Sequence, residues 1–471
     1  MIATQRTLSR ATVAGYAVGS LGTGGFATLP GLVLVFYLTD TLGVAALLAG
    51  LLVTLAKIWD VLIDPVIGAW SDRWLARTGS RRGFMMLGAV TLPLFFLLTF
   101  SVPPGLPPLA AGFWVLVAFL LTATSFSLFQ VPYIALPAEI ADGYDQRTRL
   151  LTWRVVVLTL AILLFGAGGP ALRSVSDDEY VGYLIMALVA GITIGAGMLV
   201  AVFVAPRTGA VRPDDPAAVK PSLRRHYADG IGALRRSQPF RVLLLTFLLQ
   251  GLATGLMLAA ANYVAVWVLR STDALTFLFL ALIAPAIVFA PLWGVIARRV
   301  GKERTFVLAS SLFGIAAVSL IGLLWVPGAW VYVPVALAGA GYAGMQSMPM
   351  AMLPDVISHD AVTNGPGRAG TFGGMWTAGE TTGMALGATV LSIVLAVTGY
   401  AQSTGSEVID QSTAAIGGIV VSFSVVPAVV IGFSLMAMRR YRLRRQDIDV
   451  LDPEASVRAD AATDVQTGSD R

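Results

Sequence analysis

Long apolar stretches separated by shorter polar segments make up most of the chain. Each stretch holds about 20 residues or more, the length that an α-helix needs to cross the hydrocarbon core of a bilayer. We therefore predict an all-α membrane protein with one transmembrane helix for each stretch. The twelve predicted spans centre near Gly25, Leu55, Leu94, Phe119, Leu160, Ile192, Leu252, Ile283, Gly314, Leu337, Met384 and Val426.

The longest polar segment within the apolar region divides the twelve spans six and six. The predicted regions are an N-terminal six-helix half over 1–205, a cytoplasmic central loop over 206–240, a C-terminal six-helix half over 241–438 and a cytoplasmic tail over 439–471. We expect a short amphipathic helix over 229–240 and disorder in the last part of the tail.

A weak sequence similarity between the two halves accompanies this division. Gly68 precedes Arg73 by five residues after the second span, and Gly294 precedes Arg299 by five residues after the eighth. The eighth span is the second span of the C-terminal half. Transporters that rock two halves against each other are commonly built from such repeats.

Basic residues concentrate on one side of the predicted membrane. Of the 32 lysine and arginine residues, only Arg173 and Arg270 fall in loops on the opposite side, and Lys57 and Arg154 fall within spans. Short loops rich in lysine and arginine stay in the cytoplasm. We therefore expect a multi-pass protein of the plasma or inner cell membrane with both termini cytoplasmic.

Composition excludes several other classes of protein. Charged residues make up only 13% of the chain, against about 25% in soluble domains. The absence of cysteine excludes disulfides and thiolate catalysis, and the two histidines lie in predicted loops, which argues against a histidine-rich metal site. The basic residues read as topology signals, so we expect the lipid bilayer and a small-molecule substrate as partners, and no nucleic acid.

Five charged residues fall within the predicted spans, where a charge is costly and usually functional. Lys57, Asp60 and Asp64 share one face of the second span, because they are spaced i, i+3 and i+7. Arg154 lies on the fifth span and Glu380 on the eleventh. Three acids and two bases leave one uncompensated negative charge, which suits Na⁺, Li⁺ or H⁺.

Two interpretations of these charges stay open. They hold a coupling cation, with Ser127 on the fourth span adding a hydroxyl oxygen, or they form a structural network without an ion. Glu380 either lines the solute path or faces a neighbouring helix as a protonated donor. Trp153 and Trp376 lie beside charged positions, where they can stack on a sugar or cover an alkyl chain, although most membrane tryptophans serve packing or anchoring.

No catalytic motif accompanies these charges. The sequence lacks a GxSxG nucleophile elbow, an HExxH zinc motif and a Walker glycine loop. We therefore expect a carrier, not an enzyme, with no cofactor and with a gradient of Na⁺ or H⁺ as the driving force.

Several short stretches carry a family pattern over residues 16–400. The most specific is Lys57-Ile-Trp-Asp-Val-Leu-Ile-Asp-Pro65 on the second span. The others are Phe36-Tyr-Leu-Thr-Asp40-Thr-Leu-Gly43, Pro132-Tyr-Ile-Ala-Leu-Pro-Ala-Glu139, Asp145-Gln-Arg-Thr-Arg149 and Gly365-Pro-Gly-Arg-Ala-Gly370. Together they resemble the glycoside–pentoside–hexuronide:cation symporters, a family of the major facilitator superfamily that includes the melibiose permease.

The resemblance implies a major facilitator fold and roles for individual residues. It implies that Asp60 and Asp64 bind the coupling cation with Ser127, and that Arg154 lines the site. The segment that starts at Asp72-Arg73 resembles the superfamily's loop between the second and third spans, which implies gating by these two residues.

The solute side of the family pattern is altered. The sugar-binding aspartates of the melibiose permease fall at Gly24 and Gln130, and its lysine on the eleventh span falls at Thr381. The same family resembles a lysophospholipid symporter branch. The expected solute is therefore glycoside-like or amphipathic.

We expect cation-coupled symport of this small solute by alternating access, carried out by a monomer. A proton-coupled exporter of drugs or lipids with the same fold is the alternative. A membrane sensor that has lost transport is a third hypothesis, against which the retained charges argue.

Overall fold

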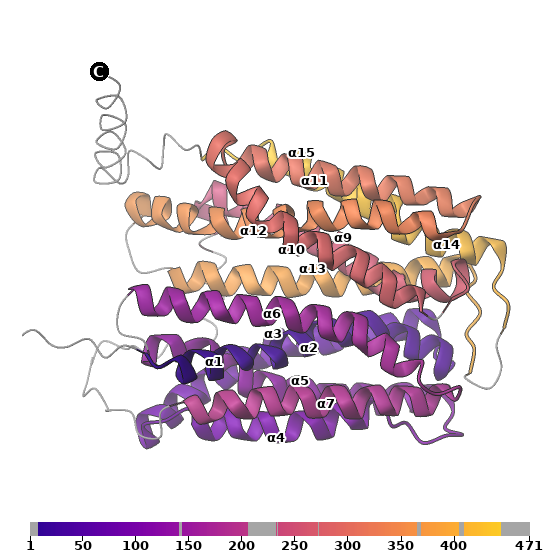
Figure 1. Ribbon diagram of the computed structural model, residues 1–471, viewed down its shortest axis with the longest axis horizontal. Helices are drawn as coiled ribbons and strands as arrows, with labels where there is room; N and C mark the ends of the chain where they lie inside the picture. Colours follow the sequence, from indigo (N-terminus) through magenta and orange to yellow (C-terminus); the bar gives the residue numbers. More distant parts are fainter. Residues whose placement is uncertain are drawn as a thin grey trace, which may run out of the picture.

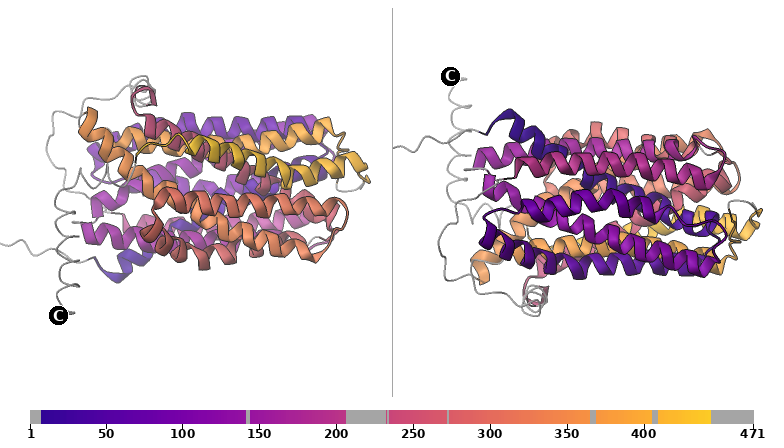
Figure 2. Two further views of the ribbon diagram at one scale, coloured as in Figure 1. Left: turned by 90° about the horizontal axis from the view of Figure 1, so that it is seen from above. Right: turned by 90° about the horizontal axis from the view of Figure 1, so that it is seen from below.

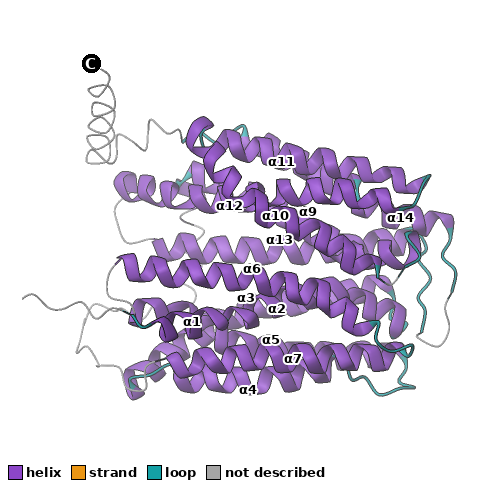
Figure 3. Cartoon of the chain, in the orientation of Figure 1, coloured by secondary structure: helices purple, strands orange, loops and turns teal. Residues whose placement is uncertain are grey.

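The computed structural model describes residues 8–140, 144–205, 232, 234–271, 273–364, 369–404 and 409–443. The described residues form helices that run side by side in one bundle (Figure 1), joined by loops at its two ends (Figure 3). Within these ranges there is no β-strand, and the single isolated β-bridge joins Leu42 to Thr404. The predicted all-α fold class is confirmed.

Six spans make up the N-terminal half. The first runs from Arg10 to Thr41, has a turn at Gly19 and ends in a π-helical turn, η1. The bounds are α1 (Arg10–Val18), α2 (Ser20–Phe36), η1 (Tyr37–Thr41), α3 (Ala46–Thr78), α4 (Arg82–Thr99), α5 (Pro108–Ile140), α6 (Tyr144–Arg173) and α7 (Glu179–Val204).

Six further spans make up the C-terminal half, of which the first again ends in a π-helical turn, η2. The bounds are α9 (Gln238–Tyr263), η2 (Val264–Val268), α10 (Ala274–Val300), α11 (Lys302–Ser319), η3 (Leu320–Leu324), η4 (Ala329–Val331), α12 (Tyr332–Asn364), α13 (Ala369–Val397), α14 (Thr413–Phe423) and α15 (Val425–Met438). Ser237 starts α9 because its hydroxyl accepts a hydrogen bond from the backbone of Phe240.

Eleven of the described helical segments are long and apolar enough to cross a membrane. The tenth predicted span, α12, is not among them, although it has 33 residues. It is rich in alanine, glycine and methionine, and it packs along α10 and α11 inside the C-terminal half. With α12, the described helices account for the twelve predicted spans.

We name the two ends of the bundle after the parts of the chain that lie there. The termini end holds Leu8 and Leu443, the first and last described residues, and the far end holds the loops after η1 and α13. Most of the central loop and the tail from residue 444 lie outside the described residues. Of the helix expected over 229–240, residues 232 and 234–240 are described, and the last three belong to α9.

The halves meet along three helix pairs. Helix α3 packs against α13, α6 against α10, and α2 against α9. Each half fills one side of the bundle, so that views from above and below place a different half in front (Figure 2). The second and fifth spans of each half therefore meet the fifth and second spans of the other.

The sequence similarity between the halves is accompanied by similarity between their helices. Pro65 and Gly68 on α3 correspond to Pro291 and Gly294 on α10. Helices α5 and α12 both have 33 residues and both carry two prolines five residues apart. The matching helices indicate that the halves are repeats of one structural unit.

Candidate functional site

The middle of α3 carries the three charges that the sequence predicts on one face. The Lys57 ammonium lies 3.2 Å from Asp60 Oδ2, and the two side chains are 26% and 13% exposed. Asp64 follows one turn later, and Ser127 on α5 lies against its carboxylate, close enough for a side-chain hydrogen bond. The structure therefore brings the predicted cation ligands together between two packed helices of the N-terminal half.

Two carboxylate oxygens in this cluster lack partners. Oδ1 of Asp60 and Oδ1 of Asp64 are buried, and neither accepts a hydrogen bond. A buried polar atom without a partner is costly unless a ligand supplies one. Carboxylate and hydroxyl oxygens are the ligands that small hard cations prefer. Over the described residues no third carboxylate or imidazole joins them, so the donor set fits a monovalent ion or a proton.

Lys57 and Arg154, the two basic residues predicted within spans, lie against aromatic rings. The Lys57 ammonium lies 5.6 Å from the centroid of the Phe26 ring, and the Arg154 guanidinium lies 5.6 Å from that of Tyr133. Tyr133 stacks on Tyr16 and donates a 2.7 Å hydrogen bond to its backbone oxygen. Arg154 Nε is buried and has no hydrogen-bond partner. The ring faces stabilise both cations, and the Nε–H group of Arg154 stays free to donate a hydrogen bond.

Two adjacent residues of α2 bear on the predicted solute residues, because Thr23 contacts Gln130 and Gly24 is itself one of them. Gln130 on α5 accepts a 2.7 Å hydrogen bond from Thr23. Gly24 packs against α6, where a Cβ would lie 2.7 Å from the Ala161 methyl and 3.1 Å from the backbone oxygen of Leu158. The structure assigns Gly24 a helix contact, and its role in solute binding stays a prediction.

The predicted solute residues of the C-terminal half lie on α13. Trp376 is 3% exposed and stacks on Phe247 of α9, with centroids 4.1 Å apart. Glu380 and Thr381 follow one turn later and are half-buried. Trp153 lies on α6 and is 52% exposed, whereas Trp376 is buried, so the two tryptophans have different surroundings.

The predicted gating pair lies near the termini end of α3. Arg73 Nε donates to the backbone oxygen of Ala69 in its own helix, and the side chain of Asp72 lies outside the described residues. Nearby, Arg81 donates a 2.8 Å hydrogen bond to Ser71, which ties the loop to the end of α3. Gating by Asp72 and Arg73 stays a prediction.

The sequence pattern gave no role to Asp40, which the structure places at the centre of the far end. Asp40 is 4% exposed, and its carboxylate accepts hydrogen bonds from three side chains. Oδ1 accepts from Trp267 at 3.1 Å and from Tyr400 at 2.5 Å, and Oδ2 accepts from Thr39 at 2.5 Å. The one sign of it in the sequence was the position of this acid, directly after the first apolar stretch.

Further contacts at the far end join the halves around Asp40. The Thr39 hydroxyl lies 2.6 Å from that of Tyr263, and its backbone oxygen accepts from the nitrogen of Ser403 at 3.2 Å. We call Thr39, Asp40, Tyr263, Trp267, Tyr400 and Ser403 the far-end network. Because its members come from both halves, the network closes this end of the bundle.

Comparison with known proteins finds transporters that match most of the chain. A family model described as MFS/sugar transport protein matches residues 15–445. The glucuronide carrier protein homolog of Escherichia coli (strain K12) is 27% identical over 442 residues, which cover 91% of each chain. The isoprimeverose transporter of Lactiplantibacillus pentosus is 23% identical over 440 residues, which cover 89% of this chain and 85% of that one.

Solved structures with low sequence identity share the fold. A bacterial homolog of the human lysosomal transporter Spinster, inward-facing and unoccupied, gives a TM-score of 0.63 at 14% identity and covers 92% of this chain and 98% of its own. The D-xylose–proton symporter gives 0.58 at 13% identity with the same coverage. The predicted major facilitator fold and secondary active symport are confirmed, and the chain belongs to the MFS/sugar transport protein family.

Proposed function

We propose that the chain couples the entry of a monovalent cation, Na⁺ or H⁺, to the entry of a small glycoside-like solute. The observation that carries this proposal is the carboxylate pair of Asp60 and Asp64, each of which holds a buried oxygen without a partner. A structural ion network would satisfy these oxygens, because orphaned buried acceptors destabilise a fold. An ion that arrives during transport satisfies them only when it is bound.

The proposed orientation places the termini end in the cytoplasm of a cell whose plasma or inner membrane holds the chain. The positive-inside pattern of the loops supports it. The far-end network then forms the outer barrier, and the described conformation is closed to the outside. Alternating access requires this network to break and a second barrier to form at the termini end.

In the proposed mechanism the cation prepares the site for the solute. Without it, the Asp60 and Asp64 carboxylates repel each other and only Asp60 has a basic partner, Lys57. A bound cation cancels this repulsion and fixes both carboxylates on α3, with Ser127 as a further oxygen ligand. The solute then meets Arg154 and Gln130 at the boundary of the halves, where transporters built from repeated halves bind their solutes.

Curated relatives support a glycoside-like solute. Their names include a glucuronide carrier protein homolog, an isoprimeverose transporter and a putative glycoside/cation symporter. Because Gly24 and Thr381 depart from the family's sugar-binding pattern, we propose the class of solute and not an individual sugar. We also propose that the chain works as a monomer and without a cofactor.

Uptake by reconstituted vesicles tests the proposal. Full-length protein in proteoliposomes is given labelled glycosides with an inward gradient of Na⁺ or of H⁺. We expect gradient-driven accumulation by the wild-type chain, and we expect Asp60→Asn and Asp64→Asn to abolish it. Asp177→Asn, at an exposed acid in the loop before α7, is the matched control. Accumulation that persists in both site variants would overturn the proposal.

A further inference from the structure

We infer that Glu380 is a solute-contacting residue that sets substrate specificity from the C-terminal half. Opposite Arg154, its carboxylate accepts the hydroxyl hydrogens of a neutral, polyhydroxylated solute and disfavours a solute that carries a carboxylate. The inference rests on the proposed function and deepens it, since it names the chemical class of the glycoside.

The internal repeat places Glu380 in correspondence with Arg154. Helices α6 and α13 match in length to within one residue, and Arg154 is the eleventh residue of α6 while Glu380 is the twelfth residue of α13. Arg154 lies on α6, the fifth span of its half, and Glu380 lies on α13, the fifth span of the other. Residues related by the repeat take equivalent places on either side of the boundary between the halves. Here the two places carry opposite charges.

Contacts between α3 and α13 set the depth of Glu380. The two helices run in opposite directions, and the hydroxyls of Thr54 and Thr389 form a hydrogen bond across them. One turn nearer the far end, Gly50 packs closely against Ser392. Continued toward the termini end, this register brings the stretch of α3 that holds the carboxylate pair level with the turn of α13 that holds Glu380.

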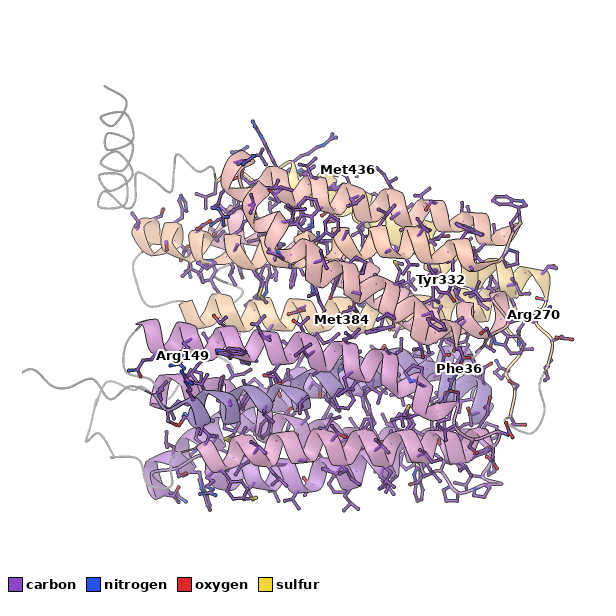
Figure 4. All side chains as sticks on the ribbon, in the orientation of Figure 1. Phe36, Arg149, Arg270, Tyr332, Met384 and Met436 are labelled. Atoms are coloured by element: carbon purple, nitrogen blue, oxygen red, sulfur yellow. The ribbon has the colours of Figure 1, made fainter. Side chains whose placement is uncertain are left out.

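Helical periodicity turns Glu380 away from the lipid. Glu380 and Thr381 are one turn from both Thr377 and Met384, so the four share one side of α13. Ile393 is 46% exposed and lies about 180° around the helix from Met384. Figure 4 places Met384 where α13 borders the N-terminal half. The Glu380 side of α13 therefore faces into the bundle.

Glu380 has no basic partner among the described residues, where no lysine or arginine forms an ion pair with it. Its polar neighbour is Tyr342 of α12, which lies within electrostatic reach. The hydroxyl of Tyr342 accepts a 3.2 Å hydrogen bond from Gln346 and keeps its own hydrogen to donate. The group around Glu380 thus offers hydrogen-bonding atoms and no positive charge.

Arg154 and Glu380 together form a donor and an acceptor on opposite halves. Guanidinium Nε of Arg154 is a buried donor without a partner, and the Glu380 carboxylate accepts only. A sugar hydroxyl both donates and accepts, so a neutral polyol satisfies the two residues at once. A carboxylate on the solute satisfies Arg154 alone and repels Glu380, which we expect to weaken binding roughly tenfold or more.

Matched pairs of glycosides test the inference. The purified full-length chain is titrated with 4-nitrophenyl β-glucoside and β-glucuronide, which differ only at C6, and with the galactoside and galacturonide. Titrations use saturating Na⁺ and are repeated in Na⁺-free buffer at low pH. We expect the wild-type chain to favour the neutral member of a pair by roughly tenfold or more, and Glu380→Gln to bring the ratio near one by strengthening uronide binding.

Two variants separate charge from structure. Glu380→Asp keeps the charge and should keep the preference, whereas Asp273→Asn, at an exposed acid of the same half, should change nothing. If Glu380→Gln fails to fold, a preference that survives in Glu380→Asp but is lost in Glu380→Ser still decides the point. A wild-type chain that binds both members equally, or a ratio that Glu380→Gln leaves unchanged, would overturn the inference while glycoside transport stands. Failure of every glycoside to bind or accumulate would overturn the proposed function as well.

Discussion

Two acidic sites in the same bundle differ in how many partners the protein supplies to their carboxylates. Asp40 in the far-end network is 4% exposed, and three side chains donate hydrogen bonds to its two oxygens. The carboxylate pair of Asp60 and Asp64 has one basic neighbour and two buried oxygens without partners. The first acid has all the partners it needs from the protein, and the pair does not.

This difference separates a barrier from a binding site. A satisfied buried carboxylate stabilises the arrangement of its donors, which here come from both halves. An unsatisfied pair gains stability only when something binds, so its free energy depends on the concentration of a ligand. Three expectations follow from this contrast, and a fourth concerns the edge of the cation site.

The largest expected effect is the loss of ion-dependent stability in the carboxylate pair. Addition of Na⁺, or of H⁺ by lowering the pH, should raise the unfolding temperature of the wild-type chain by mass action. Asp64→Asn should remove this rise, because the bound ion loses a charged ligand. Asp40→Asn should retain it. Thermal unfolding in detergent measures this rise. If both variants lose it equally, the two sites do not differ in ion binding.

Opening of the far end should follow when Asp40 is replaced by alanine. The change leaves the donors of Trp267 and Tyr400 buried without an acceptor, at a cost of about 1–3 kcal/mol for each. Because the chain has no cysteine, Leu42→Cys supplies a single thiol beside the network, 4% exposed before substitution. We expect its labelling by a membrane-impermeant maleimide from the outside to accelerate roughly tenfold or more. Asp177→Asn should leave the rate unchanged.

A smaller opening is expected from Tyr400→Phe. The ring and its edge contacts with Tyr263 and Trp267 remain, and only the hydrogen bond to Asp40 is lost. A hydrogen bond to a charged group contributes about 1.5–3 kcal/mol, so labelling at Leu42→Cys should rise less than in Asp40→Ala. A greater effect of Tyr400→Phe than of Asp40→Ala would show that the Tyr400 hydroxyl stabilises the closed far end by more than its hydrogen bond to Asp40.

The smallest effect should come from Ser127→Ala. A neutral hydroxyl is a weaker ligand than a carboxylate, and its loss should lower the apparent affinity for the coupling ion about three- to tenfold. Maximal uptake at saturating ion should change little. Uptake measured over a range of ion concentrations distinguishes this shift from the complete loss expected for the carboxylates, and a lowered maximum with unchanged affinity would contradict it.

The spacing of residues within one helix made part of the site predictable. Lys57, Asp60 and Asp64 lie on one helix, so the 3.6-residue period alone put them on one face. The twelve spans were predictable from the lengths of the apolar stretches. Helix α12 has the length of a span but falls short in hydropathy, because its many alanine, glycine and methionine residues suit close packing against α10 and α11 more than they raise the mean hydropathy.

The far-end network could not be predicted in the same way. Asp40 meets Trp267 and Tyr400 only because the fold brings three distant segments together. The sequence shows that Asp40 is present, but it does not show which residues donate hydrogen bonds to it. The same limit applies to Trp376, whose partner Phe247 lies on another helix, and to the start of α9, which a serine cap and not the hydrophobic pattern places at Gln238.

The contact at Gly24 has a consequence for attempts to redesign the carrier. Helix α2 approaches α6 so closely at this position that even a methyl group would meet Ala161 and the Leu158 backbone. An aspartate introduced there, as the melibiose permease has, would have to push the first and fifth spans apart before it could reach any sugar. A sugar contact built from an aspartate at position 24 therefore depends on the distance between α2 and α6 and requires paired changes on both helices.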